Sequence, residues 1–173
     1  IYENGEWRTD RRFYIGEPNY SETADYLITI KVPFDITIAA PGRMINHSLI
    51  SDKEKTMSFE AKNIRDFVWV GGKFDFIKKE VEGITIESYF TRKNRIVGEK
   101  LLDMAAHIVN FFSNNIGEYP YDKLVIVETD IVNSGMEYPQ LVCINAKNYD
   151  AKKMGILRGI LAHEIAHQWW YAA

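Results

Sequence analysis

The period of the hydrophobic pattern changes near residue 94, and this change constrains the fold more than any other feature of the sequence. Before it, apolar and polar residues alternate in short runs separated by Pro and Gly, as in strands with one buried face. These runs lie at 25–33, 34–42, 58–63 and 83–90. After it, apolar residues recur at helical spacing from 97 to 116, which predicts a helix with one broad buried face. The sequence therefore predicts an α+β fold.

Shorter signals complete this prediction. Gly71 and Gly72 lie between two apolar runs and predict a tight hairpin, because glycine tolerates positive φ. Apolar, β-branched runs at 123–129 and 141–145 predict two more strands. A last helix is expected to begin near Ala151 and to include His167. It is apolar nearly all round, which is typical of a helix buried in the centre of a domain.

The chain has 173 residues, a length that allows one domain or parts of two. The pattern divides it into residues 1–80, expected to be part of an all-β domain, and residues 81–173, expected to open a domain with helices and a small sheet. The sequence begins IYENGEWRTD, which is neither a start methionine nor a signal peptide. We therefore expect a fragment of a longer protein, and no targeting signal indicates a compartment.

Composition excludes several classes of protein. Hydrophobic residues make up 46% of the chain and aromatic residues 13%, so a packed core is expected rather than disorder. A net charge of -3 provides no basic patch for nucleic acid, and the apolar runs are too short for a membrane segment. The single cysteine, Cys143, excludes a disulfide within the chain. It lies in the apolar run LVCIN and is expected to be a buried core residue rather than a nucleophile.

The pattern H-E-x-x-H occurs once, at His163, Glu164 and His167. Positions i and i+4 of a helix project from one face, so both imidazoles can reach one zinc ion. Glu164 stands beside the first ligand, where its carboxylate can accept a proton from zinc-bound water. We therefore predict His163 and His167 as zinc ligands and Glu164 as the catalytic base. The other two histidines, His47 and His107, are expected to be ordinary polar residues.

A second stretch, NSGMEYPQLV, contains Glu137, 26 positions before His163. Together, SGMEY and HEIAHQWW resemble the aminopeptidase N family of zinc peptidases, the gluzincins, whose first motif usually reads GAMEN or GGMEN. The resemblance extends to GEPNYSETADYLITIKVP and GEYPYDKLVIVETD, and so covers nearly the whole chain. It implies that the second part of the chain is the first half of a thermolysin-like catalytic domain.

The resemblance also implies roles for the matched residues. Glu137 would hold the free α-ammonium of a peptide substrate, and Gly135 and Met136 would lie along the substrate backbone. A carboxylate held one residue's length from the metal would make the enzyme an exopeptidase, since a buried ammonium requires an anion. Ser134 and Tyr138 depart from the usual motif, and Tyr138 is expected to reshape the first specificity pocket.

The family's third zinc ligand is a glutamate on a following helix, which would lie beyond Ala173. Its oxyanion-stabilising tyrosine would lie further on. We therefore expect this chain alone to have little or no activity. We also expect apolar surface around Trp169 and Trp170 to favour self-association.

Three other functions remain open at this stage. A peptidase-like scaffold without catalysis is disfavoured because Glu164 is retained. An endopeptidase of the thermolysin type is disfavoured by Glu137. A family member with a second, epoxide-hydrolysing activity is not distinguished by these motifs.

Overall fold

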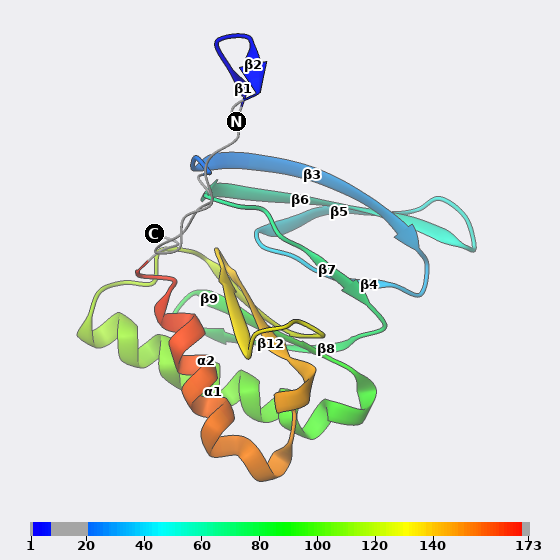
Figure 1. Cartoon of the computed structure of the whole chain (residues 1–173). Coiled ribbons are helices and arrows are strands. Elements are labelled where there is room, and N and C mark those ends of the chain that lie inside the picture. The colour runs from blue at the N-terminus through cyan, green and yellow to red at the C-terminus, as the bar shows by residue number, and fades with distance from the viewer. Residues whose placement is uncertain (1, 8–20, 171–173) are drawn as a thin grey trace.

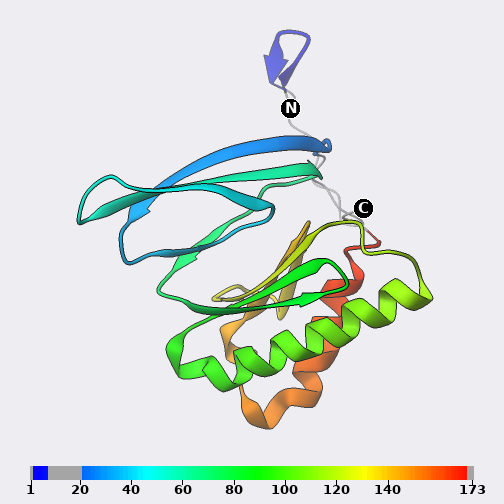
Figure 2. The same ribbon diagram turned by 180° about the vertical axis from the view of Figure 1, so that it is seen from behind.

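The structure is a computed structural model that describes residues 2–7 and 21–170. Of the segment GEPNYSETADYLITIKVP, residues 16–20 lie outside the described residues. The described chain forms three layers: an antiparallel sheet, a mixed five-stranded sheet, and two helices (Figure 1). Seen from behind, the five-stranded sheet again lies between the other two layers (Figure 2). This arrangement confirms the predicted α+β fold.

The first layer is a three-stranded antiparallel sheet in the order β3-β6-β5. Its strands are β3 (Ala24–Pro33), β5 (Arg43–Leu49) and β6 (Glu54–Ile64). Between this sheet and the next, β4 (Thr37–Ala39) pairs with β7 (Val70–Gly72). A separate small hairpin is formed by β1 (Tyr2–Glu3) and β2 (Glu6–Trp7).

The second layer has the strand order β11-β12-β10-β9-β8. The central strands β9 (Ile84–Phe90), β10 (Lys123–Thr129) and β12 (Leu141–Asn145) are parallel. The outer strands β8 (Asp75–Val81) and β11 (Gly135–Tyr138) are antiparallel to their neighbours. Alternate residues of β10 and β12 pack into two different cores, one on each face of the sheet. Burial on both faces explains why these strands read as uninterrupted apolar runs.

The third layer consists of α1 (Arg95–Asn115) and α2 (Met154–Ala166), which cover one face of the five-stranded sheet (Figures 1 and 2). In the described residues, three short 3-10 helices lie between a strand and a following helix. They are η1 (Arg92–Asn94) before α1, and η2 (Ala146–Asn148) and η3 (Ala151–Lys153) before α2. The helix predicted at 97–116 is confirmed as α1. No helix in the described part of the chain is both long and apolar enough to cross a membrane.

The predicted hairpin at Gly71 and Gly72 is wrong. Both glycines lie in β7, which pairs with β4, and neither has positive φ. Their packing is close instead: a Cβ on Gly72 would lie 2.6 Å from the Phe74 ring, and one on Gly71 would lie 3.2 Å from the Trp69 ring. The tight turn lies instead at Glu82 and Gly83, with φ of 50° and 84°, and joins β8 to β9.

The last helix is less buried than predicted. One face is fully enclosed, but Ile156 is 65% exposed and His163 is also exposed. The helix ends at Ala166, so His167 follows its last residue, although its backbone is still helical. The division between residues 1–80 and 81–173 stays a prediction; β8, which spans this point, pairs with β9 in the second layer.

Candidate metal centre

Helix α2 is anchored by three apolar side chains at i, i+4 and i+8. Leu157, Leu161 and Ile165 are completely buried against the core between the helices and the five-stranded sheet. Burying three such side chains stabilises this docking by roughly 1.5–3 kcal/mol each. The anchored face fixes the rotation of the helix, and thereby the direction in which the histidines project.

The two histidines of the motif meet at the end of this helix. Their Nε2 atoms lie 3.3 Å apart, and their rings are nearly perpendicular. Two nitrogens at about 2.0–2.1 Å from one ion, at a tetrahedral angle, stand about 3.3–3.4 Å apart. His163 and His167 are therefore already spaced as two ligands of a tetrahedral ion.

His167 is also oriented as a ligand would be. Its Nδ1 lies 3.4 Å from the carbonyl oxygen of Trp170. A metal-binding histidine commonly donates its second ring N–H to a carbonyl, which fixes the tautomer and leaves the other nitrogen free to bind. The chain after the helix is held in turn by Trp169, whose indole Nε1 donates to the Gly117 carbonyl at 2.8 Å.

Glu164 is buried beside the histidine pair, with a carboxylate oxygen within 4.8 Å of a ring nitrogen of each imidazole. It is 6% exposed, and its Oε2 has no hydrogen-bond partner among the described residues. Burial, together with the negative charge of Glu137 and a hydrogen bond to its side chain, raises the pKa of the Glu164 carboxyl to about 7 against the opposing effect of His163. A cation at the imidazoles would act in the opposite direction. A buried carboxylate oxygen without a hydrogen-bond partner, beside two imidazoles, fits a site that binds a cation and transfers a proton.

Strand β11 separates its residues between two faces. Gly135 and Glu137 pair with Ile144 and Val142, whose side chains face the helices. Glu137 Oε1 lies 3.8 Å from His167 Nε2. A Cβ on Gly135 would lie 2.3 Å from Glu164 Oε1, so the carboxylate occupies the space that a side chain would need. The structure thus brings both residues to the histidine pair.

Met136 and Tyr138 lie on the opposite face of β11. Both pack against the second core, which is centred on Val125, Val127 and Cys143. Their side chains therefore do not face the histidines. The predicted role of Tyr138 in a specificity pocket, and of the Met136 backbone along a substrate, stay predictions.

Two residues that the sequence did not single out also reach this region. Gln168 is completely buried directly after His167, and both ends of its side-chain amide bind the turn after Glu137. Gln140 in that turn is 3% exposed and has positive φ. The available signals were position alone: Gln168 directly follows the zinc motif, and Gln140 lies within the stretch NSGMEYPQLV, three residues after Glu137.

The remaining candidates are elsewhere. Within the described residues, His163, Glu164 and His167 form the group that could hold a metal, and exposed His47 and His107 are outside it. Cys143 is buried, as predicted, and burial raises the pKa of its thiol to about 11. Trp170 is 55% exposed, whereas Trp169 packs against Phe112 and Tyr119; self-association through this surface stays a prediction.

No protein-family model matches the chain. Among proteins of known function, it is similar to Aminopeptidase 2 of Candida albicans, with 27% identity over 173 aligned positions. The alignment includes 88% of this chain and 18% of the relative, so the chain spans about a fifth of that protein's length. The similarity supports a relationship to an aminopeptidase.

Proposed function

We propose that this chain contributes the metal-binding and amino-terminus-binding parts of a zinc-dependent aminopeptidase. The observation that carries the proposal is the convergence of four side chains from two sequence motifs. The His163 and His167 Nε2 atoms are 3.3 Å apart, Glu137 is 3.8 Å from His167, and Glu164 lies beside them. Similarity to a named aminopeptidase supports the same assignment.

His163 and His167 would hold the zinc ion, with a third ligand from outside the described residues. When bound, zinc supplies Lewis acidity, which lowers the pKa of water and polarises a carbonyl. Glu164 would accept the proton of the attacking water on a carboxylate oxygen and pass it to the leaving amine. Its Oε2, which has no hydrogen-bond partner among the described residues, would be the oxygen available for this transfer.

Glu137 would bind the substrate's α-ammonium. Its carboxylate is partly buried, so an ion pair there is less screened than at the surface. Among the described residues, β11 pairs with β12 on one side and leaves its other edge open, so an extended peptide can add along it. A carboxylate at this edge beside the histidine pair would favour release of single residues over internal cleavage.

Zinc titration against a competing chelator tests the metal site on this chain. His167→Ala should weaken zinc binding by more than about tenfold, because loss of even a group that supports a ligand commonly costs that much. His107→Ala, which removes an exposed histidine of α1, is the matched control. Equal affinity in both variants would contradict the metal assignment.

Peptide cleavage by the full natural chain tests the reaction. Peptides with a free amino terminus should be cleaved, and N-acetylated ones should not. Glu164→Gln should lower kcat by roughly 10²–10⁴-fold while zinc remains bound. Glu137→Gln should mainly raise KM for the free peptide. Efficient internal cleavage of the acetylated peptide would favour an endopeptidase instead.

A further inference from the structure

The only two glutamines of the chain are joined to each other at the end of the metal motif. The Gln140 backbone N–H donates to Gln168 Oε1 at 2.8 Å. Gln168 Nε2 donates to the Tyr138 carbonyl at 3.1 Å. Both ends of one buried amide therefore bind the turn that directly follows Glu137. This ties the position of Glu137 to the residue next to His167.

Gln140 connects this turn to two further parts of the molecule. Its carbonyl accepts a hydrogen bond from the Val125 N–H of β10, and its side-chain Oε1 accepts one from the Gly42 N–H, each at 2.8 Å. Its φ is 61°, a left-handed conformation that glycine would adopt with less strain. A residue in a strained backbone conformation persists only where surrounding contacts hold it there. At position 140 the contact that a glycine could not make is the side-chain hydrogen bond to the Gly42 N–H.

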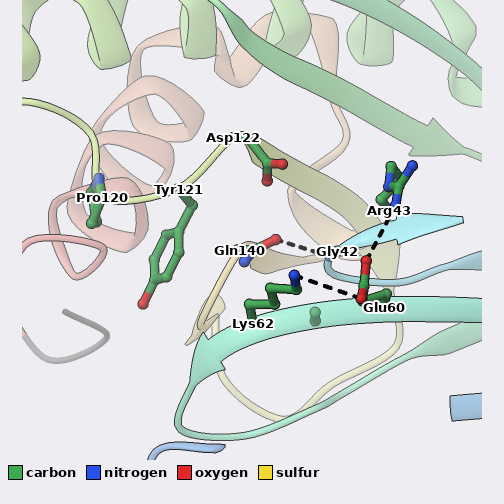
Figure 3. A pocket seen from close by; sticks show the side chains of 9 residues that line it. Gly42, Arg43, Glu60, Lys62, Pro120, Tyr121, Asp122 and Gln140 are labelled. Atoms are coloured by element: carbon green, nitrogen blue, oxygen red, sulfur yellow. Dashed lines mark hydrogen bonds and ion pairs between the residues drawn. The ribbon is translucent and has the colours of Figure 1, made fainter. Parts of the chain in front are cut away.

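Gly42 provides a fixed attachment for that side chain. It also has positive φ, and a Cβ at this position would lie 2.2 Å from the Glu60 carbonyl oxygen of β6. Its N–H is therefore held against the three-stranded sheet. Figure 3 shows the bond between Gly42 and Gln140 at the edge of a pocket of about 380 Å³. Uncharged hydrogen bonds thus run from Gly42, directly before β5, through Gln140 to Gln168, the residue directly after His167.

We propose that Gln140 and Gln168 are positioning residues that set the distance between the Glu137 carboxylate and the two imidazoles, with the β3-β6-β5 sheet as the reference. The inference rests on the proposed function and deepens it. An α-ammonium held at Glu137 reaches the metal only over a fixed length. That length is maintained by the hydrogen bonds from Gly42 to Gln140 and from Gln140 to Gln168, which we call the relay. The relay begins in the amino-terminal part of the chain.

Gln140→Gly is the sharpest test because it removes only the bond to Gly42 and relieves the left-handed backbone. In the full natural chain, KM for an aminoacyl-amide with a free α-amine should rise roughly five- to tenfold, the equivalent of one neutral hydrogen bond. Cleavage of the desamino analogue, which has no ammonium to place, should not change. The pH profile should keep its shape, because no member of the relay titrates.

Two further variants separate positioning from general stability. Glu82→Gly is the matched control, since it also replaces a left-handed non-glycine residue but lies in the remote turn between β8 and β9. Gln140→Glu retains an acceptor for the Gly42 N–H, and Arg43 and Lys62 line the same pocket (Figure 3). It should therefore restore most of the lost affinity. A rise in KM of equal size in Glu82→Gly would overturn the proposal.

Hydrogen exchange on this chain without metal gives a readout that does not depend on catalysis. In Gln140→Gly, the amides of Gly42 and of residue 140 should exchange faster, while those of β8 and β9 keep their protection. If the exchange rates of both amides are unchanged, the proposed hydrogen-bond connection is wrong, whatever the effect on activity. If the unaltered full chain shows no preference for a free α-amine while exchange responds as expected, the proposed function fails and the relay stands as a structural connection.

Discussion

At the scale of single residues, the motifs SGMEY and HEIAH pack together where a glycine leaves room for a carboxylate. Gly135 of SGMEY lies directly under the carboxylate of Glu164 from HEIAH. The glycine is needed here because of space, since its φ is not in the left-handed region. The position of the Glu164 carboxylate therefore depends on a residue that has no side chain.

Gly135→Ala should destabilise the chain by roughly 1–3 kcal/mol, because the new methyl group and the Glu164 carboxylate cannot share one space. The free energy of unfolding in urea measures this. Gly159→Ala is the matched control, since this glycine lies in the interior of α2 with nothing within 4 Å of an added Cβ. The control should be stabilised by about 0.4–1 kcal/mol. Equal stability of the two variants would contradict the predicted clash.

The sequence predicted the residues whose positions follow from local spacing. His163 and His167 converge because i and i+4 share a helix face, and Glu137 was found through its motif. Gln140 was not predictable, because its partners at Gly42 and Val125 are 98 and 15 positions away in sequence. Contacts of this kind are decided by tertiary packing, which no local pattern reports.

At the scale of elements, glycine has two structural roles, close packing and positive φ, which the sequence did not distinguish. Gly71 and Gly72 allow close packing within β7, whereas Gly83 supplies positive φ in the turn from β8 to β9. The real turn was missed because Glu82 is an unusual residue for a left-handed position. The strands β3, β9, β10 and β12 and the helix α1 were predicted well, since their periodicity reflects burial on one or both faces. The strands β5 and β11 were not predicted, and only Thr37–Ala39 of the run 34–42 is a strand.

Glu82→Asn should stabilise the chain by roughly 0.5–1 kcal/mol, because asparagine adopts the left-handed conformation more readily and Asn-Gly suits a two-residue hairpin. Thermal unfolding is the measurement. Glu118→Asn, an exposed position with ordinary φ, should remain within about 0.5 kcal/mol of the parent. Loss of stability in Glu82→Asn would mean that the glutamate makes a contact of greater value than the backbone strain.

At the scale of the whole molecule, the ionisable groups buried in the cores lower the stability of the fold at alkaline pH. Burial raises the pKa of the Cys143 thiol to about 11 and raises the pKa values of Tyr89, Tyr119 and Tyr149 above their ordinary range. In the unfolded chain these groups release their protons at lower pH. The folded state therefore binds more protons, and stability falls as pH rises above about 9.

Cys143→Val should flatten this decline between pH 9 and pH 11 by up to about 1.4 kcal/mol per pH unit, the effect of one proton. Urea unfolding at several pH values measures the slope. The tyrosines remain in both proteins, so the variant should still lose stability at higher pH. An unchanged slope between pH 9 and pH 11 would show that the thiol ionises in the folded protein as easily as in the unfolded one.

The strand order of the five-stranded sheet has a consequence for synthesis. From β8 through β9 and β10 to β12, spatial order follows chain order, and α2 comes after all of them. A chain that folds as it leaves the ribosome can therefore add each of these strands to a neighbour already present. The two imidazoles emerge only after the surface on which they dock is complete. If these histidines bind metal as proposed, nascent chains should acquire it only after all five strands of this sheet have emerged.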